Sequence, residues 1–363
     1  MKRALLVVFL IILVIILLTP FFREALVDWL NPLSYRTFPE TVDFTVRRSI
    51  VISSVSTYTV DVPEPPKIGG GTQQVFDITS SPDYNLIEKY GSDWMVWQGP
   101  GEAHIQATYH IQTRTVWWDI DESDVLSVSD ASKTNPLFIK LSTQYNHDEW
   151  RLQYEGTPIE TLASQIAPGG LSVYEIAQRI FEYLDTHISY SASRSGEVKY
   201  PTQTLQDGGG DCDDLSFLFV SLLRARGIPS WVELGAMYNS ITNEWVGHAW
   251  LNFFMPMYGG GVNVTIDMAN HEFLIRGANR FSEWKSDGNS THLEDYYYPY
   301  SYISSPNGTP SIEDTFTTID YSTTGTVVVK LGSDGGAIPG FDTVIFPIAI
   351  LVALVLMRQT KRK

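Results

Sequence analysis

The chain has 363 residues, 44% of them apolar and 13% aromatic, which is enough for two domains and too apolar for extensive disorder. Its formal net charge is -16. An acidic surface repels phosphate backbones, so the charge argues against nucleic-acid binding. The single cysteine excludes an intramolecular disulfide and a cysteine-based zinc or iron–sulfur site.

Residues 1–22 predict an N-terminal transmembrane anchor. An unbroken apolar run from Ala4 to Leu18 approaches the ~20 residues that span a bilayer. Lys2 and Arg3 precede this run and place the N-terminus on the cytoplasmic side. A cleaved signal peptide is the alternative, but the run is not followed by a small-residue cleavage site, which favours the uncleaved anchor.

Residues 41–155 predict a β-rich, sandwich-like domain. Short alternating runs such as TVDFTVRRSIVISS and HIQATYHIQTRTVWWDI are separated by Pro- and Gly-rich breaks. Several short strands with turn signals between them are typical of a sandwich. We expect this domain to act as a scaffold or spacer, and a binding role is the alternative.

A linker near YEGTPIETLASQIAPGG leads to two predicted helices and a group of strands. Ser172 and Glu175 form the pattern of a capping box at the start of an amphipathic helix that ends near HISY. A second, strongly apolar helix begins near Cys212 and ends before Gly227. The runs SWVELGAMYN, GHAWLNFFM and VNVTIDM then read as strands.

A nucleophilic thiol is expected where the glycine-rich loop GGG meets the second helix. Cys212 occupies that junction, where the helix dipole favours a thiolate and glycine amides are free to bind an oxyanion. His248 follows on one predicted strand and Asp267 ends the next. A base on one strand and its carboxylate on the neighbouring strand give a workable nucleophile–base–orienter arrangement, Cys212–His248–Asp267.

These motifs resemble the core of the transglutaminase-like superfamily. The resemblance rests on GGGDCDDLSFLFVSLLRARGIPS, GHAW and TIDMAN, with HISY and YPTQTLQ as the lead-in, and it covers about residues 170–275. It implies an α+β, papain-like core, here placed at residues 165–285, with Cys212 as nucleophile, His248 as general base and Asp267 as orienter. The sequence departs from the family where a stretch resembling D-P-T is usual, because Asp267 is followed by Met268 and Ala269.

Some neighbouring residues leave alternatives open. Asn270 could compete with Asp267 for the orienting role, although the strand register favours Asp267. Gln206, six residues before Cys212, could donate to an oxyanion as a glutamine does in papain-like enzymes. The aspartates that flank the cysteine would raise the pKa of the thiol, so we expect them to cap helix amides with their side chains turned away from the sulfur.

Residues 286–336 predict an extension and a stalk, and residues 338–357 predict a second transmembrane helix followed by the basic tail RQTKRK. A C-terminal sorting signal of the archaeal kind is the weaker alternative for IPGFDT and the run after it. Both termini are then cytoplasmic, with roughly 315 residues between the spans outside the membrane. Sequons at Asn263, Asn289 and Asn307 agree with an exported middle.

The sequence therefore predicts a membrane-anchored, extracytoplasmic thiol enzyme that acts on protein or peptide amides through an acyl-thioester. Hydrolysis by a cysteine peptidase or amidase is favoured through the resemblance. The alternatives are a cross-linking acyltransferase and a non-enzymatic surface module. No cofactor is expected, because the sequence carries no P-loop, dinucleotide fingerprint or EF-hand loop.

Overall fold

The computed structural model describes residues 35–138, 151–191, 197–306 and 308–330. The two predicted spans, residues 1–22 and 338–357, lie outside these ranges, as does Asn307. Within the described ranges, the helices are too short or too polar to cross a bilayer. Residues Tyr35–Val329 form one compact unit, and the α+β class predicted from the sequence is confirmed for it, with β-sheets first and a mixed core after them.

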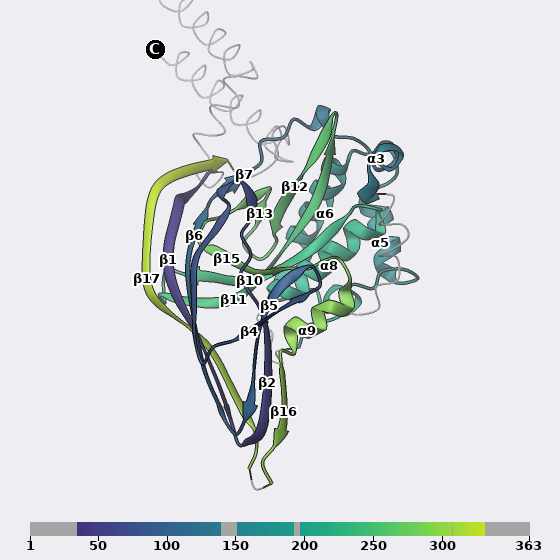
Figure 1. Cartoon of the computed structure of the whole chain (residues 1–363). Coiled ribbons are helices and arrows are strands. Elements are labelled where there is room, and N and C mark those ends of the chain that lie inside the picture. Colours follow the sequence, from purple (N-terminus) through teal and green to yellow (C-terminus); the bar gives the residue numbers. More distant parts are fainter. Residues whose placement is uncertain (1–34, 139–150, 192–196, 307, 331–363) are drawn as a thin grey trace, which may run out of the picture. The chain divides into compact units, whose positions relative to one another are not determined.

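Two antiparallel four-stranded sheets form the β region of this unit (Figure 1). The first has the order β17-β1-β6-β3, with β1 at Tyr35–Ser53, β3 at Gln73–Ser81, β6 at Ala103–Arg114 and β17 at Ser311–Lys330. The second has the order β16-β2-β5-β4, with β2 at Val55–Pro63, β4 at Asn85–Lys89, β5 at Ser92–Pro100 and β16 at Tyr300–Ser304. Apolar residues that alternate along β1 and β6 fill the core between the sheets, among them Phe44, Val46, Ile105 and Tyr109.

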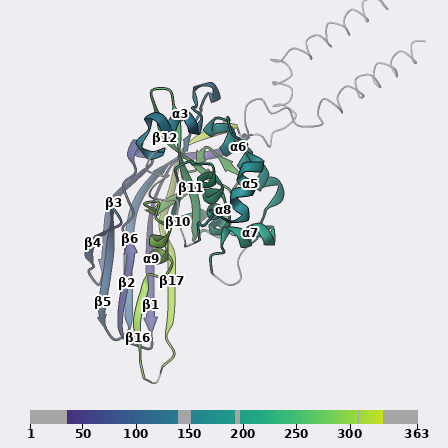
Figure 2. The same cartoon turned by 90° about the vertical axis from the view of Figure 1, so that its right-hand side faces the viewer.

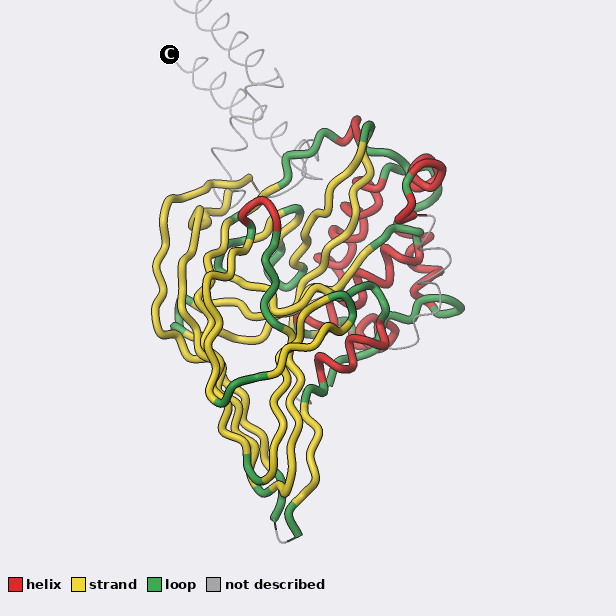
Figure 3. Tube along the Cα trace, in the orientation of Figure 1, coloured by secondary structure: helices red, strands yellow, loops and turns green. Residues whose placement is uncertain are grey.

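A five-stranded sheet with the order β13-β12-β11-β10-β15 forms the centre of the second half. Its strands are β10 (Ser230–Asn239), β11 (Glu244–Met257), β12 (Gly260–Asp267), β13 (Glu272–Phe273) and β15 (Arg280–Lys285). The helices gather on one side of this sheet and the β region on the other (Figures 2 and 3). These helices are α5 (Pro158–Ile166), α6 (Val173–His187), α7 (Pro201–Asp207) and α8 (Cys212–Ala225).

Local signals explain where the two main helices begin and end. Ser172 and Glu175 form the predicted capping box of α6 through bonds of 2.7 and 3.1 Å. Gly227 follows α8 with a φ of 76°, a left-handed conformation that glycine adopts without strain. The residues of α8 are buried on most sides, as the strongly apolar sequence of this helix indicates.

Shorter elements connect these layers. They are η2 (Gly69–Gly71), β7 (Val116–Trp117), η3 (Glu122–Asp124), α3 (Val128–Thr134), β8 (Ser189–Tyr190), β9 (Gly209–Gly210), β14 (Ile275–Arg276), η4 (Ser290–His292) and α9 (Leu293–Tyr297). β8 and β9 pair in parallel directly before α8, and this pairing fixes the approach of the chain to Cys212.

The structure differs from the sequence-based boundaries at three places. The β-strands of residues 41–155 end near Trp117, and the helix α3 follows them. The predicted linker contains α5, whose start is capped by Thr157 before Pro158. Residues 286–336 contain α9, β16 and β17, and the two strands return to the β-sheets instead of forming a stalk up to Lys330.

Candidate active site

The imidazole of His248 and the carboxylate of Asp267 form a buried hydrogen-bonded pair. β11 and β12 are antiparallel neighbours, and Asp267 lies at the end of β12. His248 Nε2 lies 2.7 Å from Asp267 Oδ2, and the two residues are 8% and 0% exposed. Because Nε2 faces the carboxylate, it carries the proton that is donated, and Nδ1 is the ring nitrogen left for the thiol.

Asn270, weighed above against Asp267, supports the pair from the turn after β12. Its backbone N–H donates to Asp267 Oδ1 at 3.1 Å, and its side-chain Nδ2 lies 2.8 Å from Asp267 Oδ2. The same Nδ2 atom lies 3.2 Å from His248 Nε2. Asp267 is therefore the principal partner of the imidazole, and Asn270 fixes the carboxylate.

Cys212 is the first residue of α8, and its thiol is partly exposed. The backbone N–H of Ala249, directly after His248, lies close enough to the sulfur to lower the pKa of the thiol. The sulfur thus lies against the strand that carries the histidine. The approach loop is tight, because a Cβ atom on Gly210 would lie 2.4 Å from Asp214 Cβ.

The aspartates around Cys212 divide into two kinds. Asp211 and Asp214 form a capping box for α8, as the sequence predicts. Asp213, by contrast, places Oδ1 at 3.9 Å from Cys212 Sγ, so the expectation that its side chain turns away from the sulfur is wrong. The hydroxyl of Tyr297 in α9 lies near the Asp213 carboxylate and opposes the increase in its pKa.

These surroundings disfavour an isolated thiolate. Burial raises the pKa of Cys212 well above its usual value, and the negative charge of Asp213 adds to the increase. Burial and the charge of Asp211 likewise raise the pKa of Asp213 to about 7. Ionisation of Cys212 therefore depends on a nearby group that accepts its proton, and His248 is the basic side chain on the adjoining strand.

The structure thus brings Cys212, His248 and Asp267 to one place, while Gln206 lies exposed on α7. The buried Arg280, whose Nη1 bonds Asp267 Oδ2, was not identified from the sequence. In the described ranges, no group of three or more His, Cys, Asp or Glu side chains is placed to hold a metal ion.

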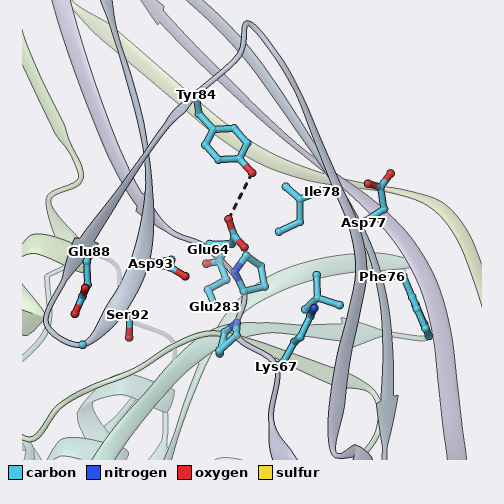
Figure 4. A pocket seen from close by; sticks show the side chains of 14 residues that line it. Glu64, Lys67, Phe76, Asp77, Ile78, Tyr84, Glu88, Ser92, Asp93 and Glu283 are labelled. Atoms are coloured by element: carbon cyan, nitrogen blue, oxygen red, sulfur yellow. Dashed lines mark hydrogen bonds between the residues drawn. The ribbon is translucent and has the colours of Figure 1, made fainter.

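A separate cavity of about 630 Å³ lies in the β region (Figure 4). The edge strands β3 and β4 and the segment after β2 surround it, and Tyr84 bonds Glu64 at its wall. Its other charged lining residues are Lys67, Asp77, Glu88, Asp93 and Glu283. The catalytic candidates do not line this cavity.

Comparison with known proteins agrees with the fold of the second half. Residues 160–262 match the family described as the transglutaminase-like superfamily, and no curated protein matches the chain. A crystal structure from Cytophaga hutchinsonii, provisionally described as a cysteine protease, aligns with a TM-score of 0.52 at 13% identity, covering 83% of this chain and 94% of its own.

Two further structures align with lower scores. A protein from Parabacteroides distasonis, provisionally described as a protease, gives a TM-score of 0.26 at 13% identity over 64% of this chain and 47% of its own. The periplasmic domain of TgpA from Pseudomonas aeruginosa gives 0.32 at 12% identity over 66% of this chain and 93% of its own. Residues 160–262 are thus similar to the transglutaminase-like superfamily, and they lie within an α+β unit that begins with β-sheets.

Proposed function

We propose that this protein is a transglutaminase-like thiol enzyme that cleaves protein or peptide amides, with Cys212 as nucleophile, His248 as base and Asp267 as orienter. The observation that carries the proposal is the bond between His248 and Asp267 beside the Ala249 N–H that contacts the Cys212 sulfur. A buried histidine needs one partner to be satisfied. Here the second ring nitrogen remains for a partly exposed thiol, which a purely structural histidine would not require.

The reaction follows from these positions. His248 Nδ1 takes the thiol proton, and the sulfur attacks the amide carbonyl to form a tetrahedral oxyanion. The Cys212 backbone N–H belongs to the first turn of α8, where amides have no partner within the helix, and it is the donor we assign to that oxyanion. The imidazolium then protonates the leaving amine, and an acyl-thioester remains on Cys212.

Water resolves the thioester when His248 removes one of its protons, and the acid product leaves with the thiol restored. An amine could take the place of water, in which case the product is a new amide. We favour hydrolysis on the resemblance to peptidase-like members of the family, and acyl transfer is the second candidate.

We further propose that the described unit acts outside the cytoplasm, held by the predicted spans at residues 1–22 and 338–357. The support is the apolar character of both segments and the basic residues that flank them on the cytoplasmic side. Envelope proteins or peptides would then be the substrates.

Mass spectrometry of a protein substrate incubated with the full-length protein and a primary amine tests the activity. New peptide termini mean hydrolysis, and incorporated amine with loss of ammonia means transfer. The C212A variant should give neither product, while H271A should retain activity, because His271 is exposed and bonds Asp185 instead of the thiol. Equal products from wild type and C212A would refute the proposal.

A further inference from the structure

The carboxylate of Asp267 is held by several donors in a dry environment. Its Oδ2 atom accepts hydrogen bonds from His248 Nε2, Asn270 Nδ2 and Arg280 Nη1. Its Oδ1 atom accepts one from the backbone N–H of Asn270. Both Asp267 and Arg280 are 0% exposed. Burial alone would raise the pKa of Asp267, but the charges of His248 and Arg280 hold it below its usual value.

Arg280 connects this carboxylate to a second one. Its Nη2 atom lies 2.5 Å from Glu272 Oε2, so one planar guanidinium spans Asp267 and Glu272. Arg36, at the start of β1, closes the series with Nη1 at 3.1 Å from Glu272 Oε1 and at 2.6 Å from the Asn270 carbonyl oxygen. His248, Asp267, Arg280, Glu272 and Arg36 therefore form a connected charge series, in which carboxylates and guanidiniums alternate from the imidazole to the β region.

The charges of this series cancel only while the imidazole is neutral. Two carboxylates, Asp267 and Glu272, face two guanidiniums, Arg280 and Arg36, and the imidazolium would add one uncompensated positive charge. A bare buried carboxylate would hold the imidazolium tightly and make it a poor acid. The neighbouring guanidinium weakens that hold.

We propose that Arg280 is a positioning residue for the proposed reaction, which aims Asp267 at His248 and balances its charge so that the imidazolium can release its proton to the leaving amine. This inference rests on the proposed function and adds a residue to it. Arg280 touches neither the substrate nor the thiol, and it acts through Asp267.

Other charged groups also face the His248–Asp267 pair and must stay constant in a test. They are Cys212 and Asp213 from the first turn of α8 and Tyr190 from β8, while Asp211 acts on Cys212 and Asp213. Arg276 provides a matched control, because it is also buried and also lies over the Trp250 ring, at 5.8 Å against 5.6 Å for Arg280. Its acidic partner is Glu233 at 3.7 Å instead of Asp267.

The test is the rate of Cys212 alkylation by iodoacetamide against pH in the full-length protein, measured by intact mass. Cys212 is the single cysteine, so every labelled molecule reports on it. R280M leaves the series with one excess negative charge, while His248 and Asn270 still hold Asp267. We expect the whole curve of alkylation rate against pH to shift to higher pH by about one unit in R280M. R280K restores the positive charge, so its curve should return to the wild-type position.

E272Q leaves an excess positive charge, so its profile should move the opposite way, to lower pH. E272Q decides the question alone if R280M does not fold. The inference is overturned if the alkylation curves of R280M and R276M coincide. It is also overturned if the E272Q curve stays at the wild-type position. Neither result affects the proposed function. A wild-type profile that H248A does not alter refutes the proposed function, and the inference fails with it.

Discussion

Asp213 offers the sharpest test of how the thiol is ionised. Its Oδ1 atom lies 3.9 Å from Cys212 Sγ. At about this distance, two like unit charges repel by ~1 kcal/mol in water and by ~4 kcal/mol at an effective dielectric constant of about 20. Burial raises the pKa of both groups, but both residues keep part of their surface in contact with solvent, so we use the lower part of this range. Removal of the charge by D213N should therefore lower the apparent pKa of Cys212 by about one unit.

The effect of D213N should itself depend on pH. The pKa of Asp213 is raised to about 7, so its carboxylate is charged above that pH and protonated below it. The charge repels the thiolate only above pH about 7, and the alkylation rates of D213N and wild type should converge at lower pH. Iodoacetamide labelling at pH 6, 7, 8 and 9, read by intact mass, measures both proteins.

A matched substitution one residue further along α8 controls for the change of side chain. Asp214 is buried, and its carboxylate accepts from backbone N–H groups, among them that of Lys199 at 2.7 Å, so D214N removes a carboxylate from the same turn of α8 that does not contact the sulfur. Equal labelling of D213N and wild type at pH 8, or an equal shift in D214N, would refute the reasoning. Circular dichroism of each variant establishes that it is folded.

Three further changes test the site and its support. H248A should reduce Cys212 labelling at pH 7 by ~100-fold through loss of the proton acceptor, while H271A labels at the wild-type rate; intact mass gives both rates. G210A should cost about 1–3 kcal/mol of stability, because the new Cβ meets Asp214, and urea unfolding of G210A beside G247A, where the space is open, checks this. F281A removes a fully buried ring between the central sheet and the β region and should cost about 3–5 kcal/mol in the same assay; a loss below ~1 kcal/mol would contradict the packing.

Local chemistry explains which elements could be predicted. The helix α6 follows its capping box, and β10 has the predicted bounds, because apolar spacing, caps and glycine stops are read within a few residues. β17 is different, since its Ser- and Thr-rich sequence resembles a stalk and only its pairing beside β1 makes it a strand. That pairing joins residues far apart in the sequence.

The same division applies to the candidate site. Cys212, His248 and Asp267 follow a family pattern whose spacing is visible in the chain, and the structure brings them together. Arg280 carries no local signal, because its importance comes from two carboxylates on neighbouring strands. Asp213 was misread for a related reason: its sequence position allows a cap, but only the three-dimensional contact with Tyr297 shows where its carboxylate points.

The packing of the central sheet argues against treating the β region as a spacer. Ala236, Trp245 and Phe281 belong to strands of the central sheet, yet they are buried in the core that β1 and β6 complete. Without β1 and β6, the second half of the unit would expose that apolar surface, with a loss of roughly 1.5–3 kcal/mol for each large side chain. The charges of the site also depend on the β region, because Arg36 of β1 supplies the guanidinium that neutralises Glu272 beside Arg280. The β region is therefore part of what sets the charge on the proposed catalytic carboxylate.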